Sequence, residues 1–342
     1  MTEDTQSKVP LFGRAWELSA TLLSGEIVTL TTDKWDPESL RMTFECNLGY
    51  MSDNYWFAKI DIYNLNAEYA TKILDGQGAT ITLSAGYQTG SGRYNVIFRG
   101  TVYQVMFERV DVVDHKVTIM AYTGMQQTIG NFVNKRGSGG MTQLALVQQM
   151  CASANTPMTI GSISPDAHSA LSQTRLPRAR PIFGDPNKFI DEVASGNGML
   201  SWYGSEGVGI STLGEADDTL EIVYDGASGQ IIGTPQQTQK GLQMNVLLDP
   251  RLRIAASPQV IKLVNSQIRQ LGLTIPAPPV FLSPDGKYQV LGLQHKGDTR
   301  GEEWYTEIVA YSSANAKLAT IQAGASAYAQ GTQTALDPRS PR

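Results

Sequence analysis

Two stretches of the chain resemble each other, and this repeat constrains the fold more than any other feature of the sequence. The first, YQVMFERVDVVDHKVTIMAY, runs from Tyr103 to Tyr122, and the second, YQVLGLQHKGDTRGEEWYTEIVAY, runs from Tyr288 to Tyr311. Both open with Tyr-Gln-Val and an apolar residue, pass through a polar middle, and close on Ile, an apolar residue, Ala and Tyr. Each pattern predicts a β-hairpin. Chance similarity is the alternative to an internal duplication that gives two related β-domains.

The polar middles of these hairpins hold two of the three histidines, His115 and His295. A metal site is one interpretation of the second, because His295 is followed by Asp298, Glu302 and Glu303. The spacing matches no zinc motif, however, and no second histidine lies nearby. We therefore expect both histidines to lie in solvated turns.

Short strand-like runs fill the chain from about Trp16 to Thr123, separated by Gly, Asn, Asp and Ser. In RMTFECNL apolar and polar residues alternate, which places Cys46 on the buried face of a strand. One helix interrupts the strands, with Asn66 as its N-cap and Gly76 as its stop. Seven strands and one helix predict a β-barrel or sandwich.

The pattern changes near Asn131. The Gly-rich basic tract NKRGSGG precedes a helical stretch, MTQLALVQQMCASA, in which Cys151 lies on the apolar side. A second helix follows a proline-rich extended segment, with Asp185 as its cap and Pro186 in its first position. The segment MLSWYGSEGVGIST then predicts a hairpin, so this part reads as a small α/β domain. Both cysteines are expected as core residues in a protein made in a reducing cytoplasm.

Composition excludes several classes of protein. The net charge is −5, which argues against a general nucleic-acid binder, because such proteins cluster Lys and Arg against phosphates. No apolar run of about 18 residues is present, so we expect no membrane span. The first residues lack the basic and apolar regions of a signal peptide.

Motifs for catalysis are equally scarce, and we expect no catalytic residue, no cofactor and no metal. The glycine-rich GYQTGSGRY lacks the Gly-Lys-Ser/Thr ending of a P-loop and lies between strands. His168 follows a helix-start signal and is expected at the surface. Adjacent carboxylates at 217–218 and 302–303 point to opposite faces of a strand, which does not suit a glycosidase. An alternative function is a β-rich carbohydrate-binding or carbohydrate-active protein whose aromatic platform comprises Trp35, Tyr50, Tyr55, Trp56 and Phe57.

The segment IYNLNAEYATKILDGQGATITLSAGYQTGSGRYNVIFRGTV resembles the first tube-like domain of baseplate hub proteins from contractile phage tails, the late control protein D superfamily. PIFGDPNKFIDEVASGNGMLSWYG resembles the small α/β domain of that family, and GTPQQTQKGLQMNVLLDPRLRI with the last hairpin resembles its second tube-like domain. The resemblance covers about residues 14–312. No inserted lysozyme or peptidase domain is seen.

The resemblance implies a mainly β fold with an α+β insert: two tube-like β-barrel or sandwich domains flank a small α/β domain. The expected boundaries are 1–130, 131–215 and 216–312, followed by a tail rich in Ala, Gln and Ser at 313–342. The implied function is that of a structural baseplate hub in the virion, assembled in the host cytoplasm. A homotrimer of two similar domains would fit both a six-fold tail tube protein and a three-fold central spike protein, contact other baseplate proteins, and surround a channel through which DNA passes without specific binding.

Overall fold

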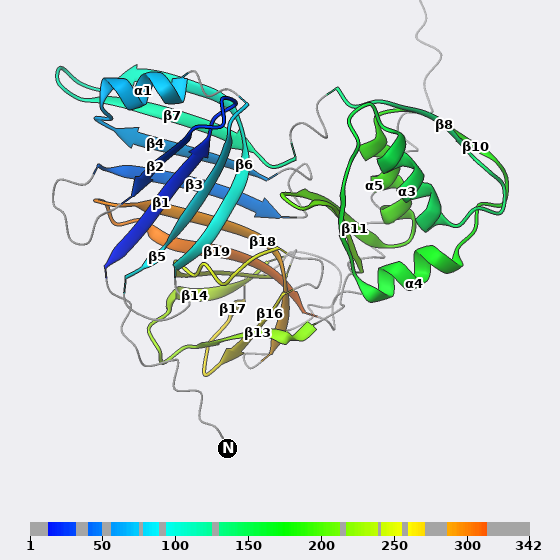
Figure 1. Ribbon diagram of the computed structural model, residues 1–342. Helices are drawn as coiled ribbons and strands as arrows, with labels where there is room; N and C mark the ends of the chain where they lie inside the picture. Colours follow the sequence, from blue (N-terminus) through cyan, green and yellow to red (C-terminus); the bar gives the residue numbers. More distant parts are fainter. Residues whose placement is uncertain are drawn as a thin grey trace, which may run out of the picture.

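The computed structural model describes residues 13–31, 40–49, 56–74, 78–88, 94–124, 130–212, 217–238, 241–254, 259–270 and 286–312. These residues form a mainly β protein (Figure 1), as the sequence predicted. A 14-stranded sheet dominates, and a small α/β unit lies to one side of it. Residues 313–342, predicted as a tail, lie outside the described residues.

The first β set supplies half of the large sheet. Its strands are β1 (Arg14–Thr21), β2 (Ile27–Thr31), β3 (Met42–Gly49), β4 (Phe57–Tyr63), β5 (Thr80–Tyr87), β6 (Tyr94–Arg109) and β7 (His115–Tyr122). They lie in the order β3-β4-β7-β6-β5-β1-β2, all antiparallel. Helix α1 (Ala67–Leu74) follows β4, and the predicted cap is present: Asn66 Oδ1 accepts the Glu68 N–H at 2.8 Å.

The second β set supplies the other half. Its strands are β13 (Asp217–Asp225), β14 (Ile231–Thr238), β15 (Gly241–Leu247), β16 (Gln259–Val264), β17 (Arg269–Gln270), β18 (Lys287–Asp298) and β19 (Trp304–Ser312). Their order is β17-β14-β15-β19-β18-β16-β13.

The two sets share a strand order. In the first set the central hairpin is β6–β7, with β4 and then β3 beside β7, and β5 and then β1 beside β6. In the second set the central hairpin is β18–β19, with β15 and then β14 beside β19, and β16 and then β13 beside β18. One direction differs, because β13 pairs with β16 in parallel whereas β1 pairs with β5 antiparallel. Tyr122 and Tyr311 therefore end equivalent strands.

The sequence comparison aligned the two Tyr-Gln-Val openings with each other, and the structure shows that this part of the alignment is wrong. In both hairpins a bulge lies opposite the closing Ala: Val102 pairs with Ala121 before one bulge, and Val290 pairs with Ala310 before the other. Val102 is thus equivalent to Val290, and the two Tyr-Gln-Val openings are offset by three residues. The closing residues carry the true correspondence.

A closed barrel, one of the two forms that the sequence predicts for each β-domain beside a sandwich, is not formed by the described residues. Strand β18 is too long for β16, with which it pairs only through Lys287–Gln289. Its remaining length, Gly292–Asp298, pairs with β3 at Thr43–Gly49, and this seam makes one continuous open sheet. A single hydrophobic core draws on both β sets. Because β18 pairs with β3, the two β sets are joined in one sheet and, in the part of the chain that the structure describes, neither set closes into a barrel of its own.

The α/β unit has its own core. It consists of β8 (Val133–Gly137), α3 (Gln143–Ser153), β9 (Ile160–Ile163), α4 (Pro165–Gln173), β10 (Arg180–Gly184), α5 (Pro186–Gly196), β11 (Met199–Gly204) and β12 (Gly207–Thr212). The predicted helix cap is confirmed, since Asp185 accepts the Asn187 N–H at 2.9 Å. Cys151 in α3 and Cys46 in β3 are both buried free thiols, as predicted.

His295 does not lie in a solvated turn, which corrects the sequence prediction. It sits inside β18, fully buried, opposite Cys46 of β3 and Thr306 of β19. Its Nδ1 is hydrogen-bonded to Thr306 Oγ1 at 2.8 Å, and its Nε2 has no partner among the described residues. Burial lowers the pKa of the ring to about 4, against a smaller opposing effect of the charge on Asp249. His115, likewise expected in a turn, begins β7 and is half-buried, with Nε2 3.0 Å from the Leu65 carbonyl oxygen.

The seam tolerates no side chain at Gly297. A Cβ there would lie 2.3 Å from the Phe44 ring and 2.9 Å from Trp304. We expect Gly297→Ala to lower the free energy of unfolding by about 1–3 kcal/mol through overpacking. Gly292→Ala is the matched control in the same strand, because its Cβ would meet nothing closer than 3.7 Å. Urea denaturation of both variants measures the difference, and equal stabilities would contradict the packing at the seam.

His295 makes the seam sensitive to acid. Because its pKa is about 4 in the folded protein and about 6.5 when unfolded, the unfolded chain binds more protons between these values. Stability should therefore fall by about 3 kcal/mol as the pH drops from 6.5 to 4. In urea denaturation at several pH values, His295→Gln should lose this part of the pH dependence, whereas His168→Gln, at an exposed residue, should keep it. Identical pH profiles for wild type and His295→Gln would refute the assignment.

Candidate assembly interface

The turn between β18 and β19 is held by arginines from the first β set. Arg14, at the start of β1, donates from Nη1 to the carbonyl oxygens of Asp298 and Gly301 at 2.5 Å each, and its guanidinium lies 5.5 Å from the Trp304 ring centroid. Arg41, next to β3, forms an ion pair with Asp298 at 2.6 Å. These contacts fasten the second hairpin to the first β set at both ends of its turn.

The same contacts set the charge on Asp298. Burial alone would raise the pKa of this carboxyl, but hydrogen bonds from Arg41 and from the backbone N–H groups of Arg300 and Gly301 hold the pKa below its usual value. The bond to Asp298 in turn raises the pKa of Arg41. Gln294 also donates two hydrogen bonds from Nε2 across the seam, to Glu45 Oε1 at 2.8 Å and to Asn47 Oδ1 at 2.6 Å.

The equivalent edge in the first β set has no strand paired with it among the described residues, although helix α1 contacts β6. Strand β6 pairs with β5 only up to Thr101, so within the described residues Gln104–Arg109 has a strand on one side alone, β7. None of these six residues is buried, and Phe107 is 54% exposed. In β18 the equivalent stretch is covered by β3, and His295 occupies the place of Phe107 with no exposed surface. An unpaired edge of this kind is a template for another strand.

The turn after β6 is also uncovered. Val110, Val112 and Val113 are 51%, 77% and 85% exposed, and they form the tip of the β6–β7 hairpin. At the corresponding turn of β18–β19, Arg14 and Arg41 cover the chain. Tyr103 adds an exposed ring, at 48%, at the base of the unpaired edge. Clustered exposed apolar side chains mark a surface for protein contact.

The counterpart of β3 in the second set is β14, whose outer edge is nearly free. Within the described ranges, only Gln236 and Gln237 of this edge are paired, with the two residues of β17. Among the strands that the structure describes, one pair of edges, β18 with β3, is therefore covered, and one pair, β6 and β14, is open.

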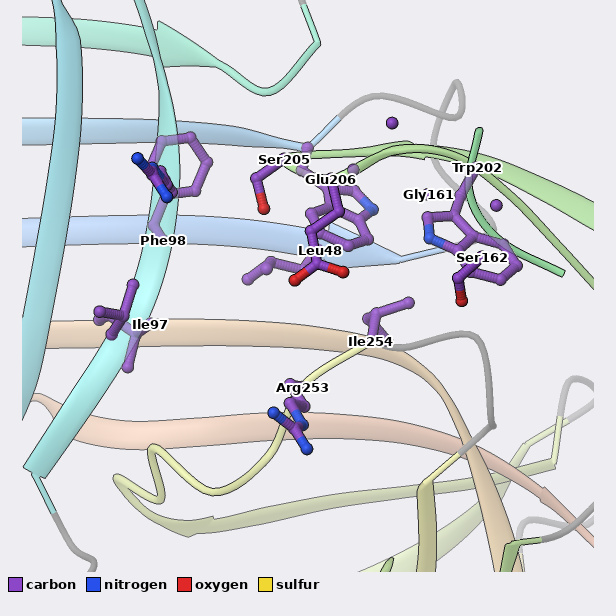
Figure 2. Close-up of a pocket in the computed structure, with 16 residues that line it drawn as sticks. Leu48, Ile97, Phe98, Gly161, Ser162, Trp202, Ser205, Glu206, Arg253 and Ile254 are labelled. Atoms are coloured by element: carbon purple, nitrogen blue, oxygen red, sulfur yellow. The ribbon is translucent and has the colours of Figure 1, made fainter. Parts of the chain in front are cut away.

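A cavity of about 450 Å³ lies where the α/β unit meets the two β sets (Figure 2). Phe98 of β6 lines one side, and Glu206 and Arg253 approach it from opposite sides in this view. Its glycine-rich wall serves packing: a Cβ on Gly209 would lie 2.1 Å from the Trp202 ring. Ser162 and Ser205 line it without a histidine to activate them.

The structure brings few of the candidate chemical residues together. Within the described part of the chain, no three His, Cys, Asp or Glu side chains are placed to hold a metal ion. His168 is exposed in α4, as predicted. Of the aromatic platform, Trp56 is buried at 7% exposure, while Trp35, Tyr50 and Tyr55 lie outside the described residues, as does most of the tip of GYQTGSGRY. No helix in the described residues is long and apolar enough to cross a membrane.

Sequence reasoning missed the contacts of Arg14 and Arg41 with the turn between β18 and β19, which we call the arginine clamp. Arg14 and Arg41 carry no local signal, because their partners lie more than 250 residues away in the sequence. Only the correspondence of the two hairpins pointed to this region.

Comparison with solved structures identifies the fold. A tail protein from Neisseria meningitidis MC58 has a TM-score of 0.52 and 10% identity, over 87% of this chain and 96% of that one. An E. coli protein, c3393, described as a type VI secretion component similar to T4 tail proteins gp27 and gp5, has the same TM-score and identity over 82% and 75%. A chain in a PdpA–VgrG complex has a TM-score of 0.52 and 9% identity over 97% and 67%.

No protein-family model and no curated protein sequence matches the chain. At these identities the likeness concerns the fold alone. The chain has the fold of structural proteins from phage tails and of VgrG proteins from type VI secretion systems.

Proposed function

We propose that this protein is the structural hub of a contractile tail baseplate and forms a homotrimer between a six-fold tail tube and a three-fold central spike. The observation that carries the proposal is the shared strand order of the two β sets, with one pair of edges covered and the equivalent pair open. The fold shared with tail proteins and VgrG supports it.

Ring closure follows from repeating the internal seam between chains. Within one chain β18 lies against β3; between chains, β6 of one copy would lie against β14 of the next. This is a head-to-tail contact, which forms a closed ring when its rotation closes. Three chains with two similar β sets each give six similar units, which suits a six-fold tube protein on one face and a three-fold spike protein on the other.

The internal seam also gives the register of the proposed contact. Gln294 lies opposite Asn47 in the seam, and the strand pairings make Met106 equivalent to Gln294 and Thr238 equivalent to Asn47. Met106 of one copy should therefore lie opposite Thr238 of its neighbour. Strand β17 would leave the edge of β14 on docking, which breaks a pairing of only two residues.

The assembled ring would surround a channel for DNA. A net charge of −5 suits a passage along which DNA moves without being retained. In this role the protein is part of the virion and contacts further baseplate proteins. It acts by geometry and needs no catalytic group. The proposal includes the division of the chain into a first β-domain that ends at 130, an α/β domain that ends at 215, and a second β-domain.

The trimer can be tested by the mass of the purified protein in solution. The double variant Gln104→Lys/Phe107→Lys places charge on the unpaired edge of β6 and should give a monomer, because charged edges oppose strand pairing. Its matched control is Leu23→Lys/Ile27→Lys, at residues 77% and 64% exposed on β2 and the turn before it, at the far end of the sheet, which should remain trimeric.

Cysteines test the register. Met106→Cys/Thr238→Cys should give covalent trimers under mild oxidation, and Met106→Cys with Gln243→Cys, on the interior strand β15, should give none. A monomeric wild type at micromolar concentration, or cross-linking that is independent of position, would overturn the proposal.

A further inference from the structure

The α/β unit carries a basic face on an otherwise acidic chain. Residues 131–184 contain five Lys and Arg residues and a single acid, Asp166, while the whole chain has a net charge of −5. Three of the cations, Lys135, Arg136 and Arg178, lie on or beside the β8–β10 ribbon and are exposed. None of the three forms an ion pair within the part of the chain that the structure describes.

The acids nearest in sequence are already occupied. Glu192 forms an ion pair with Arg180 at 2.6 Å. Asp185 caps α5, and Asp191 accepts hydrogen bonds from Ser201 at 2.6 Å and Tyr203 at 3.0 Å. The charge of the ribbon is therefore not neutralised from within its own unit.

The outer face of the ribbon is aromatic as well as basic. The register places Phe183 opposite Asn134 and Pro181 opposite Arg136, and all four side chains are exposed. Phe183 is 70% exposed, although its ring packs edge-on against Phe132 with centroids 4.8 Å apart. The inner face instead buries Val133 and Ile182 against the helices. Aromatic residues and arginine are enriched at the centres of protein–protein interfaces, and this face presents both.

We propose that the outer face of this ribbon, formed by Phe183 and Arg136 with Arg178 exposed beside the ribbon, binds an acidic and partly apolar segment of a different protein of the assembly. Charge complementarity selects an acidic partner. The exposed ring of Phe183 requires that this partner also present apolar side chains next to its carboxylates. Single-stranded or duplex DNA fits less well, because about six or more phosphate contacts are usual for a DNA-binding surface and the ribbon offers at most three cations outside ion pairs.

The position of the ribbon supports a protein partner. It lies at the outer end of the α/β unit, away from both β sets (Figure 1). The inference rests on the proposed function at this point: if the β sets form the ring around the channel, the ribbon faces outward, where neighbouring baseplate proteins bind and DNA does not pass. The contact between copies uses other strands, β6 and β14, so the two surfaces can be tested separately.

The test uses the full-length protein and a fluorescent peptide of alternating Glu and Leu, with fluorescence anisotropy as the readout. The wild type should bind this peptide more tightly than a peptide of alternating Lys and Leu and than single-stranded DNA. Arg136→Ala/Arg178→Ala and, separately, Phe183→Ser should each weaken binding about thirty-fold, as for the loss of a hot spot. The matched control Arg99→Ala/Arg253→Ala removes the same charge elsewhere and should bind as the wild type does.

Each other outcome overturns the inference. Equal binding of the Glu-Leu and Lys-Leu peptides would show that the face does not select acids, and tighter binding of single-stranded DNA would assign it to nucleic acid. Loss of the trimer in the ribbon variants would assign the face to a second copy of this chain. Because the ribbon variants should keep the trimer mass, failure of this inference is distinguishable from failure of the trimer itself.

Discussion

The pairing of β18 with β3 is the contact on which the rest of the structure depends. Seven residue pairs from Gly292–Asp298 and Thr43–Gly49 join halves of the chain that are more than 240 residues apart. Because β18 reaches past β16, part of its edge has no partner in its own β set, and β3 pairs with that part. One core then spans both β sets, and the orientation of the two sets is fixed by hydrogen bonds rather than by a linker.

The seam is specific because the packing around Gly297 leaves no room for a side chain. Gly297 allows the Phe44 and Trp304 rings to meet edge to face at 5.4 Å, and a side chain there would force them apart. On the same strand, His295 is fully buried and its pKa is low, so an uncharged ring is part of the packed state. Arg41 and Asp298 then close the end of the seam with a charge-assisted bond. A shift of register by one residue would disturb all three features at once.

Local patterns in the sequence were sufficient for the hairpins, the helix caps and the burial of both cysteines, because these depend on neighbours within a few residues. The equivalence of the two β sets was also visible in the Ile-x-Ala-Tyr closings. Burial of His295 was not, since a histidine among charged residues normally indicates a turn and only the distant strand β3 covers it. The clamp by Arg14 and the joining of the two β sets in one sheet depend on the same long-range pairing, for which one sequence carries no signal. The unpaired edge of β6 became visible only by contrast with β18.

A strand edge without a partner can pair indiscriminately with other chains, and the edge of β14 carries features that limit such pairing. The register of β14 shifts between Ile232 and Gln236, a stretch that holds Pro235 and a left-handed Gly233 with φ of +74°, and β17 covers the next two residues. Bulges, prolines and short covering strands all slow indiscriminate pairing. We expect such an edge to bind a single strand weakly. In the proposed ring, however, the last chain to join forms two interfaces while it loses its translational and rotational freedom only once. Weak guarded edges therefore favour closed rings over open filaments, provided that the rotation between copies matches the rotation between the two β sets within one chain.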